Sequence, residues 1–176
     1  MTILTVKDLA VNFETADGQV NAVRGISFEV AAGECLGIVG ESGSGKSQSA
    51  LAAMGLLAEN GRASGEILFN GTNMITAGKP ELRKIRGAEM SMIFQDPLTS
   101  LTPHMTVGAQ MREILALHQG VKGAEATRRC VEWLEHVRIP EAARRLDQFP
   151  HELSGGMRQR VMIAIAMLCG PKLLIA

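Results

Sequence analysis

Gly40-Glu41-Ser42-Gly43-Ser44-Gly45-Lys46-Ser47 fits the pattern G-x-x-x-x-G-K-[ST], the phosphate-binding loop called the P-loop. An apolar run, Cys35 to Val39, leads into it and predicts a buried strand. A helix-compatible run from Ser47 to Leu57 follows. This order of strand, loop and helix is the context that the motif needs, and it disfavours a Gly/Ser-rich turn that matches the pattern by chance.

The residue types of this loop suit phosphate chemistry. Gly40, Gly43 and Gly45 allow the backbone to turn tightly and to aim its N–H groups inward. The helix that follows adds the positive end of its dipole. Lys46 is expected to reach the β- and γ-phosphates, and Ser47 to bind Mg²⁺.

The composition bounds the class of protein. The chain has 176 residues, 46% of them hydrophobic and 20% charged, which predicts one globular domain. Its formal net charge is zero, which argues against an electrostatic nucleic-acid partner. The segment Met1 to Asp8 has no signal-peptide pattern and no apolar run is long enough for a bilayer, so a cytoplasmic location is expected. Cys35, Cys130 and Cys169 are interpreted as small core residues.

The first part of the chain is rich in strand patterns. Apolar and polar residues alternate in Ile3 to Phe13 and again in Val20 to Val30, with a turn at Asp17-Gly18 between them. A further short strand, Gly65 to Gly71, closes with an Asn-Gly turn. Two or three antiparallel strands are expected before the phosphate loop. Phe13 is a candidate to stack on an adenine ring, although a core or edge aromatic is an equal alternative.

Gln95 follows an apolar strand, Met90 to Phe94. Ligand groups in α/β sheets lie at the carboxyl ends of strands, so Gln95 could reach a metal ion or an attacking water, with a capping role as the alternative. The loop after it, Pro97 to Thr106, contains two prolines. We expect this loop and the helices after it to be a docking surface for a partner.

After this loop the sequence pattern is typical of helices. Helical apolar spacing predicts helices over Val107 to His118 and Ala124 to Val137, and a shorter one over Glu141 to Leu146. Residues 96–152 are therefore interpreted as a helical subdomain inserted after residues 1–95, the β-rich and P-loop core. The four histidines show no metal-site spacing.

Leu153-Ser154-Gly155-Gly156-Met157-Arg158-Gln159-Arg160 precedes an apolar helix over Val161 to Leu168. Ser154 is a good helix cap. Ser154 and the glycine amides could also form a second anion site, and chemistry alone leaves both interpretations open.

This segment resembles the signature motif of the ATP-binding cassette (ABC) transporter ATPases. The resemblance covers essentially the whole chain, because the phosphate loop, Gln95, a helical insertion and the signature segment occur in that family's order. Phe94 to Pro97, Ser100 to Pro103 and Pro150 to Leu153 narrow it to the importers of oligopeptides, dipeptides, glutathione or nickel. Thr102 stands where that group usually has Asn.

The resemblance implies an α/β P-loop NTPase fold with an N-terminal antiparallel β subdomain. It implies nucleotide-binding residues that run without a gap from the loop into the helix: Gly40, Glu41, Ser42, Gly43, Ser44, Gly45, Lys46, Ser47 and Gln48. It also implies that Lys46 and Gln95 are catalytic and that Ser47 and Gln95 bind the metal. Ser154 and Gly156 would contact the ATP bound by a second ATPase subunit.

The implied protein is a transport-coupled ATPase that uses ATP and Mg²⁺. It would sit peripherally on the cytoplasmic face of the inner membrane, bound to transmembrane permease subunits and to a second ATPase subunit in a homo- or heterodimer. By the same resemblance, residues 153–176 hold the signature helix and the start of the Walker B strand. The carboxylates for Mg²⁺ and water would follow Ala176, so the core is expected to be incomplete and the sequence as written to bind ATP without turning it over.

Two alternatives belong to other classes. One is a soluble ATPase of the same family that acts on nucleic acid or ribosomes, which the neutral charge and the compact helical insertion disfavour. The other is a non-catalytic nucleotide-binding module.

Overall fold

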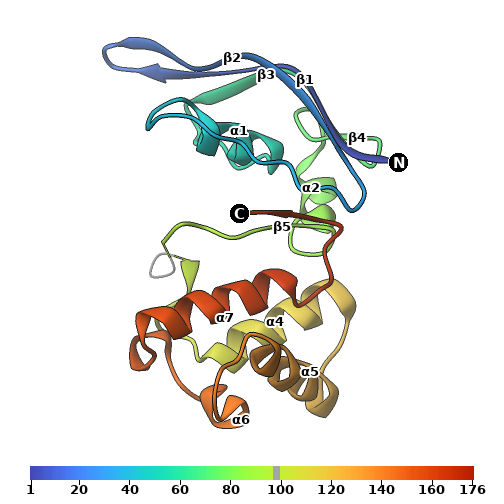
Figure 1. Ribbon diagram of the computed structural model, residues 1–176, viewed down its shortest axis with the longest axis vertical. Coiled ribbons are helices and arrows are strands. Elements are labelled where there is room, and N and C mark those ends of the chain that lie inside the picture. Colours follow the sequence, from blue (N-terminus) through green and yellow to red (C-terminus); the bar gives the residue numbers. More distant parts are fainter. Residues whose placement is uncertain (97–99) are drawn as a thin grey trace. The chain divides into compact units, whose positions relative to one another are not determined.

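A computed structural model describes residues 1–96 and 100–176 (Figure 1). The contacts divide the chain into two compact units, Met1–Arg83 and Lys84–Ala176. Because residues 97–99 are not described, part of the predicted loop Pro97 to Thr106 lies outside the described residues. The division into residues 1–95, 96–152 and 153–176 stays a prediction.

A four-stranded antiparallel sheet builds the first unit (Figure 1). Its spatial order is β2-β1-β3-β4, formed by β1 (Thr2–Thr15), β2 (Gly18–Ala31), β3 (Gly61–Phe69) and β4 (Thr72–Asn73). The predicted hairpin of two strands before the phosphate loop is confirmed, with its turn at residues 16–17.

The predicted Asn-Gly turn joins β3 to β4. Asn70 and Gly71 have φ angles of 46° and 86°, the two positive values that a type I′ hairpin turn requires. Asn tolerates this backbone region and Gly adopts it freely, so the dipeptide sets the register of the hairpin.

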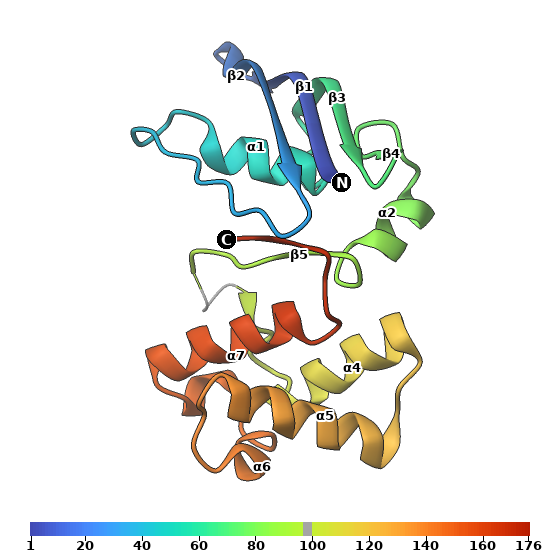
Figure 2. The same cartoon turned by 45° about the vertical axis from the view of Figure 1, so that its right-hand side comes forward.

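The helix α1 (Lys46–Ala53) packs on one face of this sheet and contacts β1 and β2 (Figure 2). The helix buries Ala52 and Ala53, and Met54 directly after it is buried too; the sheet buries Leu9 and Ile67. The helix ends earlier than the predicted Leu57. Gly55 adopts φ 62°, a left-handed value that ends a helix.

The predicted strand Cys35 to Val39 is wrong for this structure, in which these residues have no strand conformation. Leu36, Ile38 and Val39 are 41%, 50% and 93% exposed. A strand needs a hydrogen-bonded neighbour, and no described strand pairs with this run. Cys35 is exposed as well, so its interpretation as a core residue is also wrong.

The second unit contains a two-stranded parallel sheet, β5 (Met90–Met92) and β6 (Leu173–Ile175). Met90 pairs with Leu173 and Met92 with Ile175. The strand β5 was expected from its apolar run, and β6 from the resemblance, as the start of the Walker B strand. The strand β6 is only half-buried, with Leu174 39% exposed. A short helix, α2 (Lys79–Ile85), crosses the boundary between the two units.

Helices fill the rest of the second unit (Figures 1 and 2). They are α4 (Val107–Gln119), α5 (Gly123–His136), α6 (Ala142–Arg145), a 3₁₀ turn (Pro150–Glu152) and α7 (Gly155–Met167). All three predicted helices of the insertion are confirmed. The helix α7 begins six residues before the predicted Val161, because Ser154 caps it there.

One core joins these helices. Fully buried side chains come from α4, α5 and α7, and include Met111, Leu115, Leu134, Val161 and Ala164. Cys130 is buried among them, as expected, and this desolvation raises the pKa of its thiol to about 11. Among the described helices, none has the length and apolar composition that a membrane span requires.

A β-bulge shapes the sheet of the first unit. Lys7 pairs with Glu66 and Ala10 with Ser64, so two residues of β1 lie opposite Gly65 alone. Gly65 has φ 91°, and a Cβ there would lie 2.4 Å from the carbonyl oxygen of Asp8. Only glycine fits this position without moving the backbone.

Gly65→Ala is expected to lower the free energy of unfolding by about 2–4 kcal/mol, from the strained φ together with the clash. The matched control is Gly71→Ala, which has a positive φ but no atom within 4 Å of the new Cβ. It should cost about 1–2 kcal/mol. Urea unfolding of both variants measures the difference, and equal losses would contradict the role assigned to the bulge.

Candidate functional site

The phosphate loop, Gly40–Ser47, turns through two left-handed glycines. Gly43 has φ 80° and Gly45 has φ 90°, and the Ser44 N–H donates to the Glu41 carbonyl at 3.2 Å. A Cβ at Gly45 would lie 2.3 Å from the carbonyl oxygen of Ala22. The close approach to β2 therefore fixes where the loop ends and α1 begins.

Lys46 folds back over the loop. Its Nζ donates to the carbonyl oxygens of Gly40 at 2.6 Å and Glu41 at 2.8 Å, and to Ser44 Oγ at 3.3 Å. All three contacts lie within the loop, so the ammonium is held at its mouth. A Cβ at Gly40 would lie 2.7 Å from Ser44 Oγ, which shows how tightly the loop closes.

Among the described residues, no side chain caps the N-terminus of α1, and the first turn of this helix carries no acidic residue. The capping position is Gly45, which offers only backbone. Ser47 and Gln48 follow in the first turn, and the Ser47 side chain is exposed. Uncapped N–H groups and the helix dipole together favour an anion at this end.

Phe13 lies in β1, between Val20 of β2 and Gly61 of β3. A Cβ at Gly61 would come within 2.7 Å of Phe13 Cε1, so the ring rests against that glycine. The ring is half-buried. This packing supports the alternative of a sheet aromatic, and adenine stacking stays a prediction.

Gln95 follows β5 in the second unit and its side chain is exposed. The Ile93 N–H still donates to the Ile175 carbonyl at 2.8 Å, so the pairing with β6 continues one residue past Met92. Since β5 and β6 are parallel, Gln95 and Ala176 both follow the same edge of the sheet. This is the edge at which α/β sheets place ligand groups.

Ser154 caps α7, as predicted, by accepting the Met157 N–H at 3.3 Å. Gly155 and Gly156 open the helix, and both are exposed. Neither has a positive φ, and a Cβ on either would meet nothing within 4 Å. Neither the backbone conformation nor the packing among the described residues therefore requires glycine at these two positions.

Sequence reasoning missed how this segment is held. Arg158 donates from Nε to the Leu153 carbonyl at 3.0 Å, which fixes the peptide just before Ser154. Arg160 donates from Nη1 to the Arg138 carbonyl at 2.9 Å. The two arginines are visible in the sequence, but their acceptors are backbone atoms that no pattern names.

The structure brings the residues Gly40 to Gln48 together as one cradle in the first unit. Gln95, Ser154 and Gly156 belong to the second unit. Across residues 1–96 and 100–176, no group of three or more His, Cys, Asp or Glu residues is placed to hold a metal ion.

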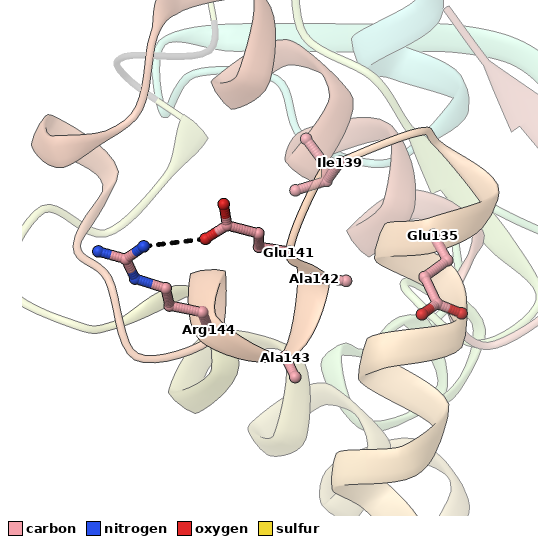
Figure 3. Close-up of a pocket in the computed structure, with 6 residues that line it drawn as sticks. All are labelled: Glu135, Ile139, Glu141, Ala142, Ala143 and Arg144. Atoms are coloured by element: carbon pink, nitrogen blue, oxygen red, sulfur yellow. Dashed lines mark hydrogen bonds and ion pairs between the residues drawn. The ribbon is translucent and has the colours of Figure 1, made fainter.

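A cavity of about 410 Å³ lies between the end of α5 and α6 (Figure 3). An ion pair of 2.9 Å joins Arg144 to Glu141 on its wall, and Glu135 and Ile139 line the other side. None of the predicted site residues lines it. The cavity therefore adds nothing to the candidate site.

Comparison with known proteins identifies a matching family, similar relatives and similar solved structures. The family described as ABC transporter matches residues 23–176. The chain is 58% identical over 174 residues to the oligopeptide transport ATP-binding protein OppD of Escherichia coli (strain K12), covering 99% of this chain and 52% of that protein. It is 51% identical over 176 residues to OppD of Bacillus subtilis (strain 168), covering 99% of this chain and 49% of that one.

Among solved structures, the chain resembles the ATP-binding cassette MJ0796 in a dimeric post-hydrolysis state bound to ADP and Pi. The TM-score is 0.85 and the identity 26%, over 97% of this chain and 72% of that one. The chain spans about half the length of the curated relatives it matches.

These findings confirm the predicted fold class and the resemblance to the peptide importer group. The family match extends from Val23 through the phosphate loop and the signature segment to Ala176, so this protein belongs to the ABC transporter family.

Proposed function

We propose that this chain is the ATP-binding part of an ABC importer, which binds and hydrolyses ATP to drive uptake of peptides or related small solutes. The observation that carries the proposal is the phosphate loop: a closed turn with Lys46 at its mouth and an uncapped helix behind it. The names of the relatives supply the solute class. Those names do not favour the alternative, a soluble ATPase that acts on nucleic acid.

The loop fits a triphosphate. Its N–H donors come from the backbone at the start of α1, where no side chain competes for them. The Lys46 ammonium would exchange the carbonyl oxygens of Gly40 and Glu41 for β- and γ-phosphate oxygens, which are charged and therefore stronger acceptors.

Mg²⁺, when bound, would neutralise charge on these phosphates. The exposed Ser47 hydroxyl at the start of α1 would be its ligand in the first unit. Gln95 is exposed beyond the carboxyl end of β5, and by the family resemblance its role would be to hold a metal ion or an attacking water. Lys46 and Gln95 would thus be the two catalytic residues of this chain.

The open space at Gly155 and Gly156 supports a role for a second ATPase subunit. Glycine in the middle of a helix costs about 0.5–1 kcal/mol relative to alanine, and no described atom lies within 4 Å of a Cβ built at either position. A close approach from outside would explain both glycines. We propose that Ser154 and Gly156 contact the γ-phosphate of ATP bound by the partner ATPase subunit.

The remaining partners are transmembrane. We propose that the protein binds permease subunits at the cytoplasmic face of the inner membrane. The contact would include Gln95, the described part of the loop from Ser100 to Thr106, and the helices after it. This segment joins Gln95, a candidate nucleotide-site residue, to the helices that follow it. A change of conformation at Gln95 could therefore be transmitted to the transmembrane partner.

Lys46→Ala should abolish high-affinity ATP binding, because Lys46 is the side-chain cation that the loop itself holds at its mouth. We expect at least about a hundredfold loss, the size of a lost charge-assisted contact to phosphate of about 3 kcal/mol. Isothermal titration of the protein at its full natural length with ATP and Mg²⁺ measures the affinity.

The matched control is Lys79→Ala, which removes an exposed lysine at the start of α2. It should bind ATP like the parent. Parental affinity in the Lys46→Ala variant would refute the role of the loop.

Gly155→Ala and Gly156→Ala should each raise the free energy of unfolding by about 0.5–1 kcal/mol, because alanine favours the helix and meets no atom. The same changes should leave ATP binding at the phosphate loop intact. In the protein at its full natural length they should abolish ATP-dependent dimerisation and hydrolysis, because the new methyl groups would occupy the space left for the partner's nucleotide.

Urea unfolding, ATP titration and light scattering with ATP separate these effects. Thr127→Ala, at a half-buried position of α5, serves as a control for a substitution in another helix. Variants that are stabilised and still dimerise with ATP would contradict the proposed contact.

A further inference from the structure

Gln110 is a buried polar residue on the core-facing side of α4. It is 8% exposed, and its neighbours on that side, Val107 and Met111, are fully buried. A buried amide destabilises a protein unless it finds hydrogen-bond partners. The partners of Gln110 therefore tell what the residue does.

All the hydrogen bonds of this side chain reach one surface turn. Its Oε1 accepts the Thr102 N–H at 2.9 Å, and its Nε2 donates to the carbonyl oxygens of Thr102 and Met105, both at 3.0 Å. The Met105 N–H closes the turn on Thr102 at 3.2 Å. We call Thr102–Met105 the proline turn.

The proline turn is anchored on both sides. Leu101 before it is buried in the helical core, and Thr106 after it caps α4 by accepting the Ala109 N–H at 3.2 Å. Its two central residues, Pro103 and His104, are exposed. The turn thus exposes two side chains to solvent, while the Gln110 amide fixes its backbone from the core side.

We infer that Gln110 is a positioning residue for recognition of the transmembrane subunits: it holds the proline turn in one shape, so that Pro103 and His104 meet a cytoplasmic segment of that partner. The inference rests on the proposed function. An apolar side chain of similar size could fill the core position of Gln110. The amide differs from it in the hydrogen bonds to Thr102 and Met105, which hold the proline turn. A turn that is ordered beforehand loses less entropy on binding.

The test uses the protein at its full natural length with Gln110→Leu, which keeps the volume and removes the hydrogen bonds. The matched control is Gln119→Leu on the same helix, whose Nε2 donates to the Cys169 carbonyl at 3.0 Å and not to the turn. Hydrogen exchange at the Met105 amide reports the order of the turn. Binding is measured to inverted membrane vesicles from the protein's own source that hold the transmembrane subunits and have been stripped of ATPase subunits.

Gln110→Leu should speed exchange at Met105 by about tenfold or more, since each lost hydrogen bond accounts for up to about a tenfold change. It should weaken binding to the vesicles at least about tenfold and leave ATP affinity unchanged. Gln119→Leu should match the parent in all three. Unchanged exchange at Met105 would overturn the inference, and so would faster exchange with parental binding to the vesicles.

A second variant covers the case in which Gln110→Leu unfolds. Pro103→Ala with His104→Ala keeps the backbone partners of Gln110 and removes the side chains that the turn presents. It should keep its fold and lose binding to the vesicles by at least about tenfold, and parental binding would again overturn the inference. Failure of the parent itself to bind these vesicles would instead overturn the proposed function.

Discussion

The contact between Gly45 and β2 governs the geometry of the phosphate loop. A Cβ at Gly45 would lie 2.3 Å from the Ala22 carbonyl oxygen, and φ there is 90°, so both the space and the backbone conformation require glycine. This left-handed residue is also the cap of α1, and it leaves the first N–H groups of the helix without a side-chain acceptor. Packing against the sheet and phosphate chemistry therefore depend on the same residue.

Local patterns predicted most elements of the fold. Alternation gave β1 and β2, and helical spacing gave α4, α5 and α6, because each of these elements is paired or packed with a close neighbour in sequence. The run Cys35 to Val39 has the same apolar character, but apolar character alone specifies burial and not a hydrogen-bonded neighbour. No described strand supplies that neighbour, so the prediction failed there.

In the candidate site, too, some features could be predicted from the sequence and others could not. The phosphate loop and the cap at Ser154 could be predicted because their spacing is dictated by backbone geometry. The contacts that Lys46, Arg158 and Gln110 make could not be predicted, because most of their partners are backbone groups, which no sequence pattern distinguishes. A signal for Gln110 did exist: three residues after Val107, it interrupts the apolar side of a predicted helix. A polar side chain at such a buried position is expected to have hydrogen-bond partners.

Some glycines of this chain are required by the backbone conformation or by packing, and others are not. Gly65 and Gly45 have both a left-handed φ and a carbonyl oxygen too close for a Cβ, so the fold alone requires them. Gly43 needs glycine for its φ of 80°, although space around it is open. Gly155 and Gly156 have neither constraint and still start a helix, where alanine would be more stable. No contact among the described residues explains them, and this observation supports the proposed approach of a partner's nucleotide to α7 without reference to the motif.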